Sequence, residues 1–553
     1  MNETAALELI PLGGLGEFGM NLMVYRHGRD CLVVDAGMMF PGAEHLGVDV
    51  VIPNLEFLDV CGTIHGIVLT HGHEDHIGAA PFLLDRHPVP AYATPFTLGL
   101  LRRKLQERTE THASLLRRLP PPGQPQALGP FQVDTIPVAH SIPHSVMLVV
   151  RTPVGTVLHT ADFKLASGPL DGVGTDLARL ARLGEEGVLA LLSDSTNADR
   201  PGFTPGEGAV RPAFDALVST ARRRVFVTTF ASHIHRIQEV TSIAVEHGRK
   251  VALVGSSMLQ NAEVAEDLGL LSFPAGSRIA AEDAMDLAPE RTLLLATGSQ
   301  GEPASALARI AVDKHRDAFL DDGDLVVHSA RAIPGNEKSI GRMFNHLHRR
   351  GATVVTEAEA RVHVSGHPAS EELRLLVHIV RPRFLVPIHG EYRQLDAHAR
   401  IGRDAGIPRA NVVLADTGDV IRLTRDACSV VDRVPVGQVF IDASLSEVDL
   451  VVLRDRKQIA GDGIVVTIVA VDRESGAVRG TPEIVTRGFV PELEDETLLP
   501  DAARAVAEAV REATPEERSD EGLLKERVHA ELKRFLRRRT QRRPLIIPIL
   551  VEL

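Results

Sequence analysis

The sequence is short of cysteine, of long apolar runs and of basic charge. Three cysteines in 553 residues (Cys31, Cys61 and Cys428) are too few for a disulfide framework. They lie in apolar surroundings without CxxC spacing, which predicts buried structural thiols. No apolar run reaches the roughly 18 residues that a membrane helix needs, and residues 1–4 lack the features of a secretory signal. We therefore expect a cytoplasmic protein with no membrane span.

The lack of a basic surplus limits one class of function. The formal net charge is −13, whereas proteins that bind any polyanion through their overall charge usually present a basic surface. Arginine-rich clusters at residues 102–104, 222–224 and 537–539 each fit a solvated helix face or a strand edge. The negative net charge thus disfavours a protein that binds polyanions through its overall charge. It does not exclude a local basic channel for an anionic substrate.

What the chain does have is enough apolar sequence for two or three domains, since its length exceeds the usual limit of a single core. Short apolar segments between glycine and proline turns predict a strand-rich first part with strands at residues 7–11, 22–25, 31–35, 66–70, 146–151, 157–160 and 188–192. Strands then alternate with longer helical patterns, which predicts βα units around a parallel sheet, with strands at 224–229, 251–255, 292–297, 325–329 and 353–356. A third pattern predicts a small α/β domain with strands at 464–471 and 545–553 and helices at 502–513 and 519–537.

Metal-ligand side chains are concentrated in one hexapeptide, HGHEDH at residues 71–76. It directly follows the apolar run at 66–70, so the ligands come after the end of a predicted buried strand. Imidazole and carboxylate groups suit zinc or manganese. We expect the first two histidines to face one ion from a loop, and Asp75 and His76 to face another, with a helix beginning directly after the motif at 77–84. The strand-loop-helix context favours a metal site over a histidine-rich surface loop.

Two ions need more ligands than this hexapeptide offers, and three further polar residues lie at predicted strand ends. His140 precedes a strand, whereas Asp162 and His389 each follow one. A bridging carboxylate such as Asp162 would hold two ions about 3.5–4 Å apart, a separation at which the oxygens of a phosphoryl group can be engaged. The pattern favours phosphodiester chemistry.

These motifs, in their order along the chain, resemble those of a known superfamily. Asp35, the HxHxDH run at 71–76, His140 and Asp162 match successive motifs of the metallo-β-lactamase fold. The segments SDSTN at 193–197, HVSGH at 363–367 and PIHGEYR at 387–393 look like the added β-CASP motifs of nucleic-acid-processing members. With GGLGEFGMN at 13–21 and FAS at 230–232, the chain resembles the bacterial ribonuclease J family over nearly its full length.

The resemblance implies an α/β fold, namely a metallo-β-lactamase αββα sandwich with an inserted β-CASP domain and a small C-terminal α/β domain. The implied bounds are 1–205 and 370–440 for the two parts of the core, 206–369 for the β-CASP domain, 441–461 for a linker and 462–553 for the C-terminal domain. The active site is expected between the core and the β-CASP domain. The apolar strand at 545–551 fits self-association as a homodimer or homotetramer, and equally the core of its own domain.

The resemblance also implies an activity. Members of this kind are metal-dependent ribonucleases that degrade single-stranded RNA 5′ to 3′ from a 5′-monophosphate end and also cut internally. A hydroxide held between two metal ions would attack phosphorus, and the products would carry 5′-phosphates and 3′-hydroxyls. The expected roles are RNA maturation and decay, including rRNA processing and mRNA decay, together with other proteins of RNA decay.

Site residues are carried over from the matched motifs. The first zinc or manganese ion would be held by His71, His73 and His140, and the second by Asp75, His76 and His389, with Asp162 bridging and Asp35 orienting ligands. Candidate catalytic residues are Asp75, His76, Asp194 and His367, of which either of the last two could manage the leaving-group proton. The implied substrate-binding residues are Ser232, His233, Ile234, His363, Val364, Ser365, Gly366 and His367. An accessory divalent ion is expected near Gly47, Asp49 and Asp442.

Two positions depart from the family pattern, because His233 stands where asparagine is common and His144 where aspartate is common. Both departures leave the expected ligands intact. Of the two histidines near residue 142, His140 is the expected ligand because the family's histidine opens the HSIP stretch.

Three alternatives stay open at this point. They are a β-CASP nuclease of other specificity, acting on DNA or only as an endonuclease, a small-ester hydrolase of the general metallo-β-lactamase kind, and a catalytically silent RNA-binding scaffold. The inserted domain disfavours the ester hydrolase. The full ligand set disfavours the scaffold, because an open two-metal site needs all its ligands to lower the pKa of bound water. We therefore expect an active nuclease.

Overall fold

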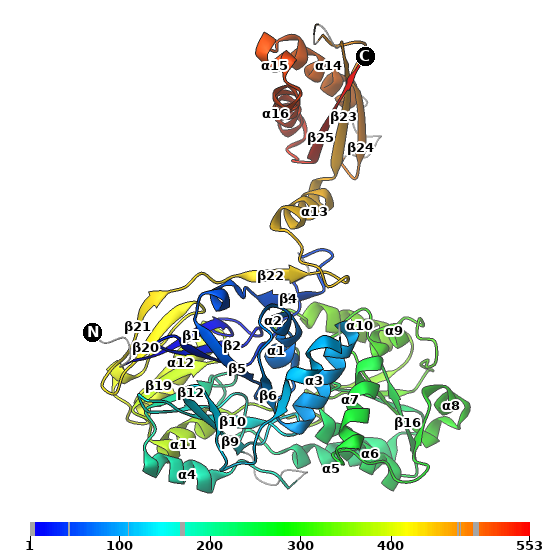
Figure 1. Ribbon diagram of the computed structural model, residues 1–553. Helices are drawn as coiled ribbons and strands as arrows, with labels where there is room; N and C mark the ends of the chain where they lie inside the picture. The colour runs from blue at the N-terminus through cyan, green and yellow to red at the C-terminus, as the bar shows by residue number, and fades with distance from the viewer. Residues whose placement is uncertain are drawn as a thin grey trace. The chain divides into compact units, whose positions relative to one another are not determined.

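The computed structural model describes residues 6–42, 45–108, 110–165, 172–472, 475, 477–489 and 497–553. The chain forms two compact units (Figure 1), the first made of Met1–Met39 and Val51–Val439 and the second of Phe40–Val50 and Phe440–Leu553. All three cysteines are buried and free, as their apolar surroundings predicted. Within the described ranges, no helix combines the length and the apolar content that crossing a membrane would require.

Two sheets lie face to face in the first unit. The first sheet has the strand order β21 (Cys428–Arg433), β20 (Asp419–Leu423), β1 (Leu7–Gly13), β2 (Leu22–His27), β3 (Asp30–Val34), β5 (Thr63–Val68), β6 (Ala91–Ala93) and β7 (Leu116–Arg118). The second has the order β19 (Phe384–Ile388), β12 (Ala190–Asp194), β11 (Thr156–His159), β10 (Val146–Arg151), β9 (Phe131–Pro137) and β8 (Gln126–Leu128). Leu32 and Val68 of the first sheet share one buried core with Leu148 and Leu192 of the second. Strands buried on both faces need continuous apolar sequence, which is why these runs were recognisable.

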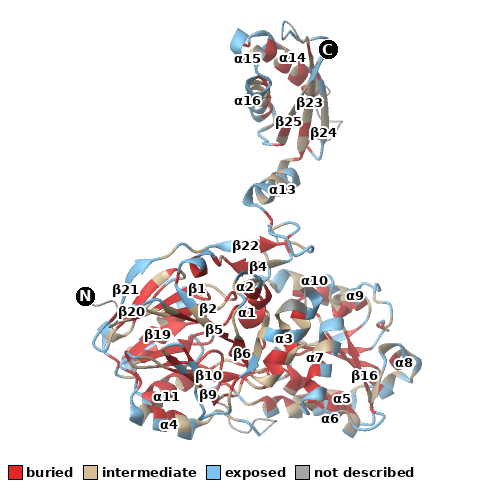
Figure 2. Ribbon diagram, viewed as in Figure 1, coloured by how far each residue is buried: buried red, intermediate tan, exposed pale blue. Residues whose placement is uncertain are grey.

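Helices cover the outer faces of both sheets. The helices are α2 (Ala80–Arg86) and α3 (Pro95–Arg108) on the first sheet, and α4 (Leu177–Glu186), α11 (Ser370–Val380) and α12 (Tyr392–Asp404) on the second. For example, Leu183 of α4 and Leu376 of α11 share a core with Leu191 of β12. The buried strands lie between these helices in Figure 2. The expected αββα layering and α/β class are confirmed.

A third sheet in the same unit consists of parallel pairs only, in the order β15 (Arg278–Ile279), β14 (Lys250–Val254), β16 (Thr292–Ala296), β13 (Val225–Thr228), β17 (Leu325–His328) and β18 (Thr353–Val355). One face packs on α5 (Arg211–Thr220), α6 (Ile234–Glu246) and α7 (Ser256–Asp267), and the other on α8 (Ala281–Asp286), α9 (Ala306–Ala311) and α10 (Glu337–Arg349). These are the expected βα units. The sheet lies inside residues 206–369, although the exact domain bounds stay a prediction.

The second unit holds a three-stranded sheet in the order β24 (Glu483–Arg487), β23 (Ile464–Val471) and β25 (Leu545–Glu552). Its helices are α13 (Leu450–Asp462), α14 (Leu498–Arg511), α15 (Pro515–Ser519) and α16 (Glu521–Thr540). Val469, Val506, Val528 and Leu532 form part of its core. The segment expected as a linker, 441–461, overlaps helix α13, which Asp449 caps by accepting a hydrogen bond from the Val451 N–H.

Strand β25 pairs with β23 alone among the described residues, so it is an edge strand. Its side chains alternate, with Ile546 buried and Ile547, Ile549 and Val551 about two-fifths exposed. Self-association through this strand stays a prediction.

Candidate metal centre

The expected metal ligands come from separate places in the chain and meet at one edge of the two facing sheets. Asp162 follows β11 and His389 follows β19, two parallel strands joined through β12. Because the carboxyl ends of parallel strands meet at the same edge of a sheet, these side chains lie close together. His140 precedes β10 in the same sheet, and the HGHEDH motif follows β5 of the other.

The expected helix start after the motif is wrong by three residues. Helix α1 (Glu74–Ile77) begins inside the motif, with His73 as its extended N-cap, and α2 starts at Ala80. Two acidic side chains, Glu74 and Asp75, lie in the first turn, where the helix dipole favours negative charge. The helix therefore carries Asp75 and His76, while the two earlier histidines lie before it.

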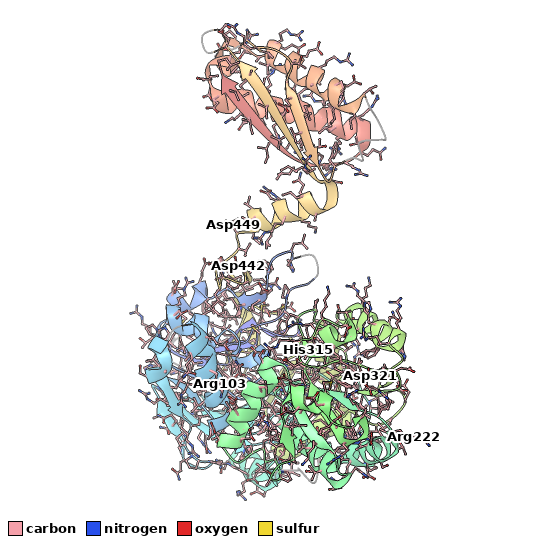
Figure 3. All side chains as sticks on the ribbon, turned by 90° about the vertical axis from the view of Figure 1, so that its right-hand side faces the viewer. Arg103, Arg222, His315, Asp321, Asp442 and Asp449 are labelled. Atoms are coloured by element: carbon pink, nitrogen blue, oxygen red, sulfur yellow. The ribbon has the colours of Figure 1, made fainter. Side chains whose placement is uncertain are left out.

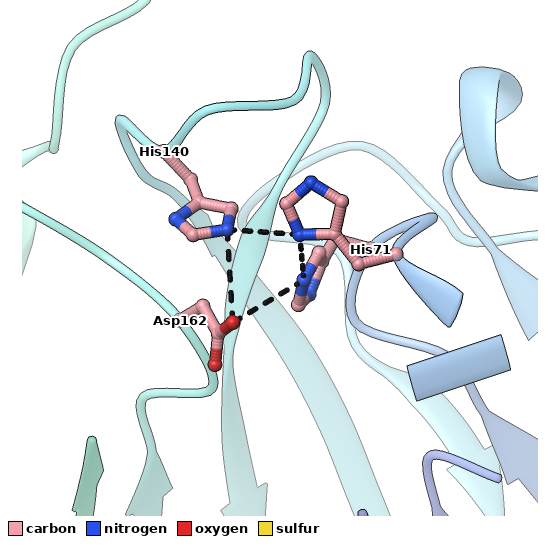
Figure 4. A group of neighbouring side chains, drawn as sticks. His71, His140 and Asp162 are labelled. Carbon is pink, nitrogen blue, oxygen red and sulfur yellow. Dashed lines mark hydrogen bonds and ion pairs between the residues drawn. The ribbon is translucent and has the colours of Figure 1, made fainter. Parts of the chain in front are cut away.

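The first group of ligands is His71, His73, His140 and Asp162, whose nitrogen and oxygen atoms lie within 4.8 Å of one another. The Nε2 atoms of His71 and His140 each lie 3.1 Å from Nδ1 of His73. The same two Nε2 atoms lie 3.5 and 3.6 Å from Oδ2 of Asp162. Figure 4 shows His71, His140 and Asp162 pointing toward one another.

The second group is Asp75, His76, Asp162 and His389. Nε2 of His76 lies 3.4 Å from Oδ2 of Asp162, and Nε2 of His389 lies 3.5 Å from the other oxygen, Oδ1. Asp75 Oδ2 lies 3.3 Å from Nε2 of His389. Asp162 thus belongs to both groups and offers an oxygen to each, which is the arrangement of a bridging ligand.

Hydrogen bonds fix the orientation of the histidines nearest β5. Asp35 Oδ2 accepts from Nδ1–H of His76 at 2.7 Å and from the Thr70 hydroxyl at 2.9 Å. Since the Thr70 proton is used, its oxygen accepts from Nδ1–H of His71 at 3.1 Å. Both rings therefore turn Nε2 toward Asp162, which supports the orienting role expected for Asp35.

The two distant histidines are oriented in the same way. Nδ1–H of His140 donates to the carbonyl oxygen of Gly366 at 2.8 Å. The Thr196 hydroxyl donates to Asp194 at 2.7 Å and therefore accepts from Nδ1–H of His389, also at 2.7 Å. Each ring again has its Nε2 atom directed into the site.

Burial and charge shift the pKa values of the histidines in this site in opposite directions. Burial and the neighbouring histidines hold the pKa values of His71 and His140 well below their usual range, so both rings are neutral. Burial lowers the pKa of His389, but Asp162 and hydrogen bonds to Asp194 and Asp75 outweigh it and raise the pKa to about 10. Burial favours protonation of Asp162, yet His389 and His76 hold its pKa well below the usual range.

These donors fit divalent cations. Several unprotonated imidazole nitrogens converge with buried carboxylates, and converging lone pairs repel one another unless a cation lies among them. Asp162 Oδ1 is buried and has no hydrogen-bond partner among the described residues, although a buried acceptor normally has one. Imidazole with carboxylate is a donor set that suits zinc and manganese, and it does not distinguish between them.

Three residues at the site have strained, left-handed backbone conformations. Asp35, Ala161 and His389 are non-glycine residues with φ values of 61°, 47° and 55°. Left-handed conformations of this kind cost of order 1–3 kcal/mol each and persist where the surrounding structure enforces them, commonly at functional sites. Here they direct the ends of β3, β11 and β19 so that ligand side chains face inward.

A close backbone contact beside the motif gives a test of ligand geometry. A Cβ atom at Gly37 would lie 1.7 Å from the Asp75 carbonyl oxygen, so Gly37→Ala must displace the helix that carries Asp75 and His76. We expect the affinity for zinc or manganese to fall by about 10–100-fold and the free energy of unfolding by about 1–3 kcal/mol. Elemental analysis after dialysis and thermal unfolding measure the two effects.

The control is Gly341→Ala, where a Cβ atom in α10 would meet nothing within 4 Å. Metal content equal to wild type in Gly37→Ala would contradict the expectation.

A third group joins Asp162 and His389 to Asp194 and His367. Asp194 Oδ2 accepts from Nδ1–H of His367 at 2.8 Å. Asp194 is fully buried, and its other oxygen holds Thr196. The two candidates for the leaving-group proton therefore form one hydrogen-bonded pair beside the ligands.

The structure brings the HVSGH loop (residues 363–367) next to the ligands. The Ser365 hydroxyl accepts from Asn197 Nδ2 at 2.8 Å, and a Cβ at Gly366 would lie 2.7 Å from His140 Nδ1. Val364 is buried in the apolar core. The roles of this loop in substrate binding stay predictions.

The other expected substrate residues lie in the loop between β13 and α6 and at the first position of α6. Ser232 is partly exposed, whereas His233 is 1% exposed and Ile234 packs fully inside the core. Contacts of these residues with substrate also stay predictions.

The expected accessory site lies in the second unit (Figure 3 labels Asp442). The Gly47 carbonyl oxygen accepts from Nη1 of Arg456 at 3.2 Å, and Asp442 Oδ1 accepts from the N–H and hydroxyl of Ser444. The Asp49 N–H donates to the carbonyl of Ile441 at 2.8 Å. The Arg456 guanidinium thus already binds the Gly47 carbonyl oxygen, which was one of the expected ligands of the ion. The accessory ion stays a prediction.

One of the arginine clusters is largely paired. Arg223 and Arg224 both contact Asp321, at 3.0 and 2.7 Å, while Arg222 is exposed (Figure 3). Arg103 of another cluster pairs with Glu263 at 2.7 Å. Arg103 and Arg223 are partly exposed, which fits the solvated-face interpretation, whereas Arg224 is buried.

Two residues that orient the ligands had no assigned role at the level of sequence. Asn21 Nδ2 donates to the Asp75 carbonyl at 3.0 Å and lies 3.2 Å from His76 Nε2. Thr196 connects Asp194 with His389. Both lie in segments that carry the family resemblance, at 13–21 and 193–197. Their place in these motifs was the one feature of the sequence that could have indicated a role at the site.

The fold and this centre define a metallo-β-lactamase-type protein with an inserted β-CASP domain. Residues 15–222 match the metallo-beta-lactamase superfamily, 222–347 the ribonuclease J beta-CASP domain, 352–412 the Zn-dependent metallo-hydrolase RNA specificity domain and 451–553 the ribonuclease J C-terminal domain. The chain belongs to the ribonuclease J family, which confirms the resemblance seen in the sequence.

Relatives match over nearly the full chain. Ribonuclease J of Thermus thermophilus is 41% identical over 99% of this chain and 95% of its own length. Ribonuclease J2 of Bacillus subtilis is 37% identical over 99% of both chains, and ribonuclease J of Mycobacterium tuberculosis is 38% identical over 99% and 98%. A crystal structure of a protein of unknown function from Enterococcus faecalis V583 is similar in fold, with a TM-score of 0.53 and 16% identity over 76% of this chain and all of that one.

Proposed function

We propose that this protein is a metal-dependent ribonuclease that degrades single-stranded RNA 5′ to 3′ from a 5′-monophosphate end and also cuts internally. The observation that carries the proposal is the double ligand group joined through Asp162, with the HVSGH loop hydrogen-bonded to ligand His140. A phosphate held by that loop would lie beside the ligands, so the next phosphodiester along the chain is the one presented for hydrolysis. Family membership supports RNA as the substrate class.

The first ion would be held by His71, His73 and His140, and the second by Asp75, His76 and His389, with Asp162 serving both. When bound, zinc or manganese ions supply Lewis acidity for a phosphoryl oxygen and lower the pKa of a water. The protein keeps the Nε2 atoms directed inward through Asp35, Thr70, Gly366 and Thr196. That preorganisation means that little reorientation is needed when substrate binds.

The Asp194–His367 pair would manage the proton of the departing 3′-oxygen. His367 is about one-fifth exposed at its side chain, while Asp194 is fully buried. The imidazole is therefore the member of the pair that a substrate can reach, and Asp194 would hold it in place.

The test follows a single-stranded RNA with a 5′-monophosphate, labelled in parallel at each end, with manganese or zinc and with a chelator. We expect immediate release of mononucleotide from the 5′ label, slower cleavage when the end is a 5′-hydroxyl, and no product with chelator. Internal fragments appearing without mononucleotide would instead support an endonuclease. Metal-independent binding with no cleavage would favour the scaffold, and cleavage of DNA at the same rate would contradict RNA specificity.

A further inference from the structure

A buried cluster of charge lies beneath the HVSGH loop. The Glu207 carboxylate contacts Lys164 Nζ at 3.1 Å through Oε1, and Arg236 Nη2 at 2.7 Å through Oε2. Nε2 of His233 also lies 3.1 Å from Oε2. All four residues are at least 95% buried.

Glu207 lies where three parts of the chain meet. It opens the short 3-10 turn η4 (Glu207–Val210), between the first part of the sandwich and the parallel sheet. Lys164 comes two residues after the bridging Asp162, and Arg236 lies in the first turn of α6. The Glu207 carboxylate thus connects the segment after β11, which carries Asp162, with the first turn of α6.

The same two cations hold the HVSGH loop by its backbone. Lys164 Nζ donates to the carbonyl oxygen of Ser365 at 2.9 Å. Arg236 Nη1 donates to the carbonyl oxygen of Val362 at 2.8 Å and to the Ser329 hydroxyl. Lys164 and Arg236 therefore hold two carbonyl groups that flank His363 and Val364. Both cations are in turn bound by Glu207.

The charges in this cluster do not balance. Two cations face a single carboxylate, and buried charge is costly unless it is paired. Burial alone would raise the pKa of Glu207, but His233, Arg236 and Lys164 hold it well below its usual range, so it is ionised. Within the described part of the chain, the buried atoms Arg236 Nε and His363 Nδ1 have no hydrogen-bond partner. The surplus positive charge lies next to the loop proposed to receive a phosphate, where it favours an anion.

We propose that Glu207 is a positioning residue that sets the affinity of the site for the 5′-phosphate of RNA, by holding Lys164 and Arg236 against the HVSGH loop. This inference rests on the proposed function and assigns the choice of 5′ end to a residue outside the motifs. Among the described residues, the hydrogen bonds and ion pairs of the Glu207 side chain go to Lys164, Arg236 and His233 and not to an expected metal ligand, so it acts on binding and not on the hydrolytic step.

The experiment compares the full-length protein with Glu207→Gln, which keeps the shape of the side chain and removes its charge. Binding is measured first, in chelator, by fluorescence anisotropy with a 3′-labelled single-stranded RNA that bears either a 5′-monophosphate or a 5′-hydroxyl. We expect wild type to prefer the monophosphate. In Glu207→Gln, Lys164 and Arg236 lose the carboxylate that holds them against the loop. This loss of position should outweigh the added positive charge and weaken binding of the monophosphate RNA by about 10–100-fold, while binding of the hydroxyl form stays unchanged.

Steady-state kinetics then separate positioning from a general structural effect. With manganese, KM for the 5′-monophosphate RNA should rise by the same factor while kcat changes little. Hydrolysis of bis(p-nitrophenyl) phosphate, which has no 5′-phosphate end, should be unchanged. Glu207→Asp keeps the charge and should restore part of the preference. Glu239→Gln is the matched control, because Glu239 lies in α6, the helix that carries Arg236, and pairs with Arg211 at 3.0 Å.

Each outcome decides the inference. Equal loss of binding for both RNA ends, or loss of bis(p-nitrophenyl) phosphate hydrolysis in Glu207→Gln, would assign Glu207 to general structure and overturn the proposal. A wild-type protein without preference for the 5′-phosphate would also overturn it. If wild type binds the phosphate end selectively but cleaves no RNA, the proposed function fails while the role of Glu207 stands. Should Glu207→Gln not fold, as judged by thermal unfolding, Arg236→Gln carries the same expectation, because it leaves Glu207 paired with Lys164.

Discussion

Asp162→Asn should reduce RNA hydrolysis by about 10³-fold or more, because Asp162 belongs to every ligand group in the centre. The amide keeps the volume but removes the negative charge, and it presents N–H groups toward histidine lone pairs. A loss of about 4 kcal/mol of electrostatic stabilisation corresponds to roughly this factor in rate. The carboxylate is 1% exposed, so water cannot replace it.

Metal content gives a readout that does not depend on activity. Elemental analysis after dialysis should find fewer zinc or manganese ions per chain in Asp162→Asn than in wild type. Asp324→Asn is the matched control, since Asp324 is fully buried but pairs with Arg223 in the parallel-sheet region. Full metal content together with near-normal cleavage in Asp162→Asn would contradict the bridging role.

The hexapeptide could be interpreted from sequence because its ligands are neighbours along the chain and follow a recognisable strand. Asp162 and His389 were also accessible to sequence reasoning, since each directly follows an apolar strand and parallel strands end at one edge. The fold class followed from similar reasoning, because the strands buried on both faces are continuous apolar runs.

Contacts between residues far apart in the chain could not be derived in that way. The bond from His140 to the Gly366 carbonyl joins positions 226 residues apart, and neither residue has a local pattern that predicts the other. Glu207 resembles any exposed glutamate in a turn until the fold places Lys164 and Arg236 around it. Sequence reasoning also missed the early start of α1, because a four-residue helix is too short for its periodicity to be detected.

His367→Gln should slow RNA hydrolysis by about 10²–10⁴-fold, the usual contribution of a positioned proton donor. The departing 3′-oxygen of RNA is a poor leaving group unless it receives a proton, and His367 is the partly exposed member of the pair with Asp194. The same variant should hydrolyse bis(p-nitrophenyl) phosphate within about threefold of wild type, because p-nitrophenolate leaves without protonation. Parallel rate measurements with both substrates test this.

Asp194→Asn distinguishes the two candidate donors of the leaving-group proton, Asp194 and His367. Asp194 holds His367 at 2.8 Å and also the Thr196 hydroxyl that orients His389. Its loss should therefore slow both substrates, since a ligand is disturbed together with the proton donor, whereas loss of His367 alone should slow only RNA. Equal slowing of both substrates by His367→Gln would instead mean that this imidazole supports the metal centre itself, and the proton would then have to come from another group or from water.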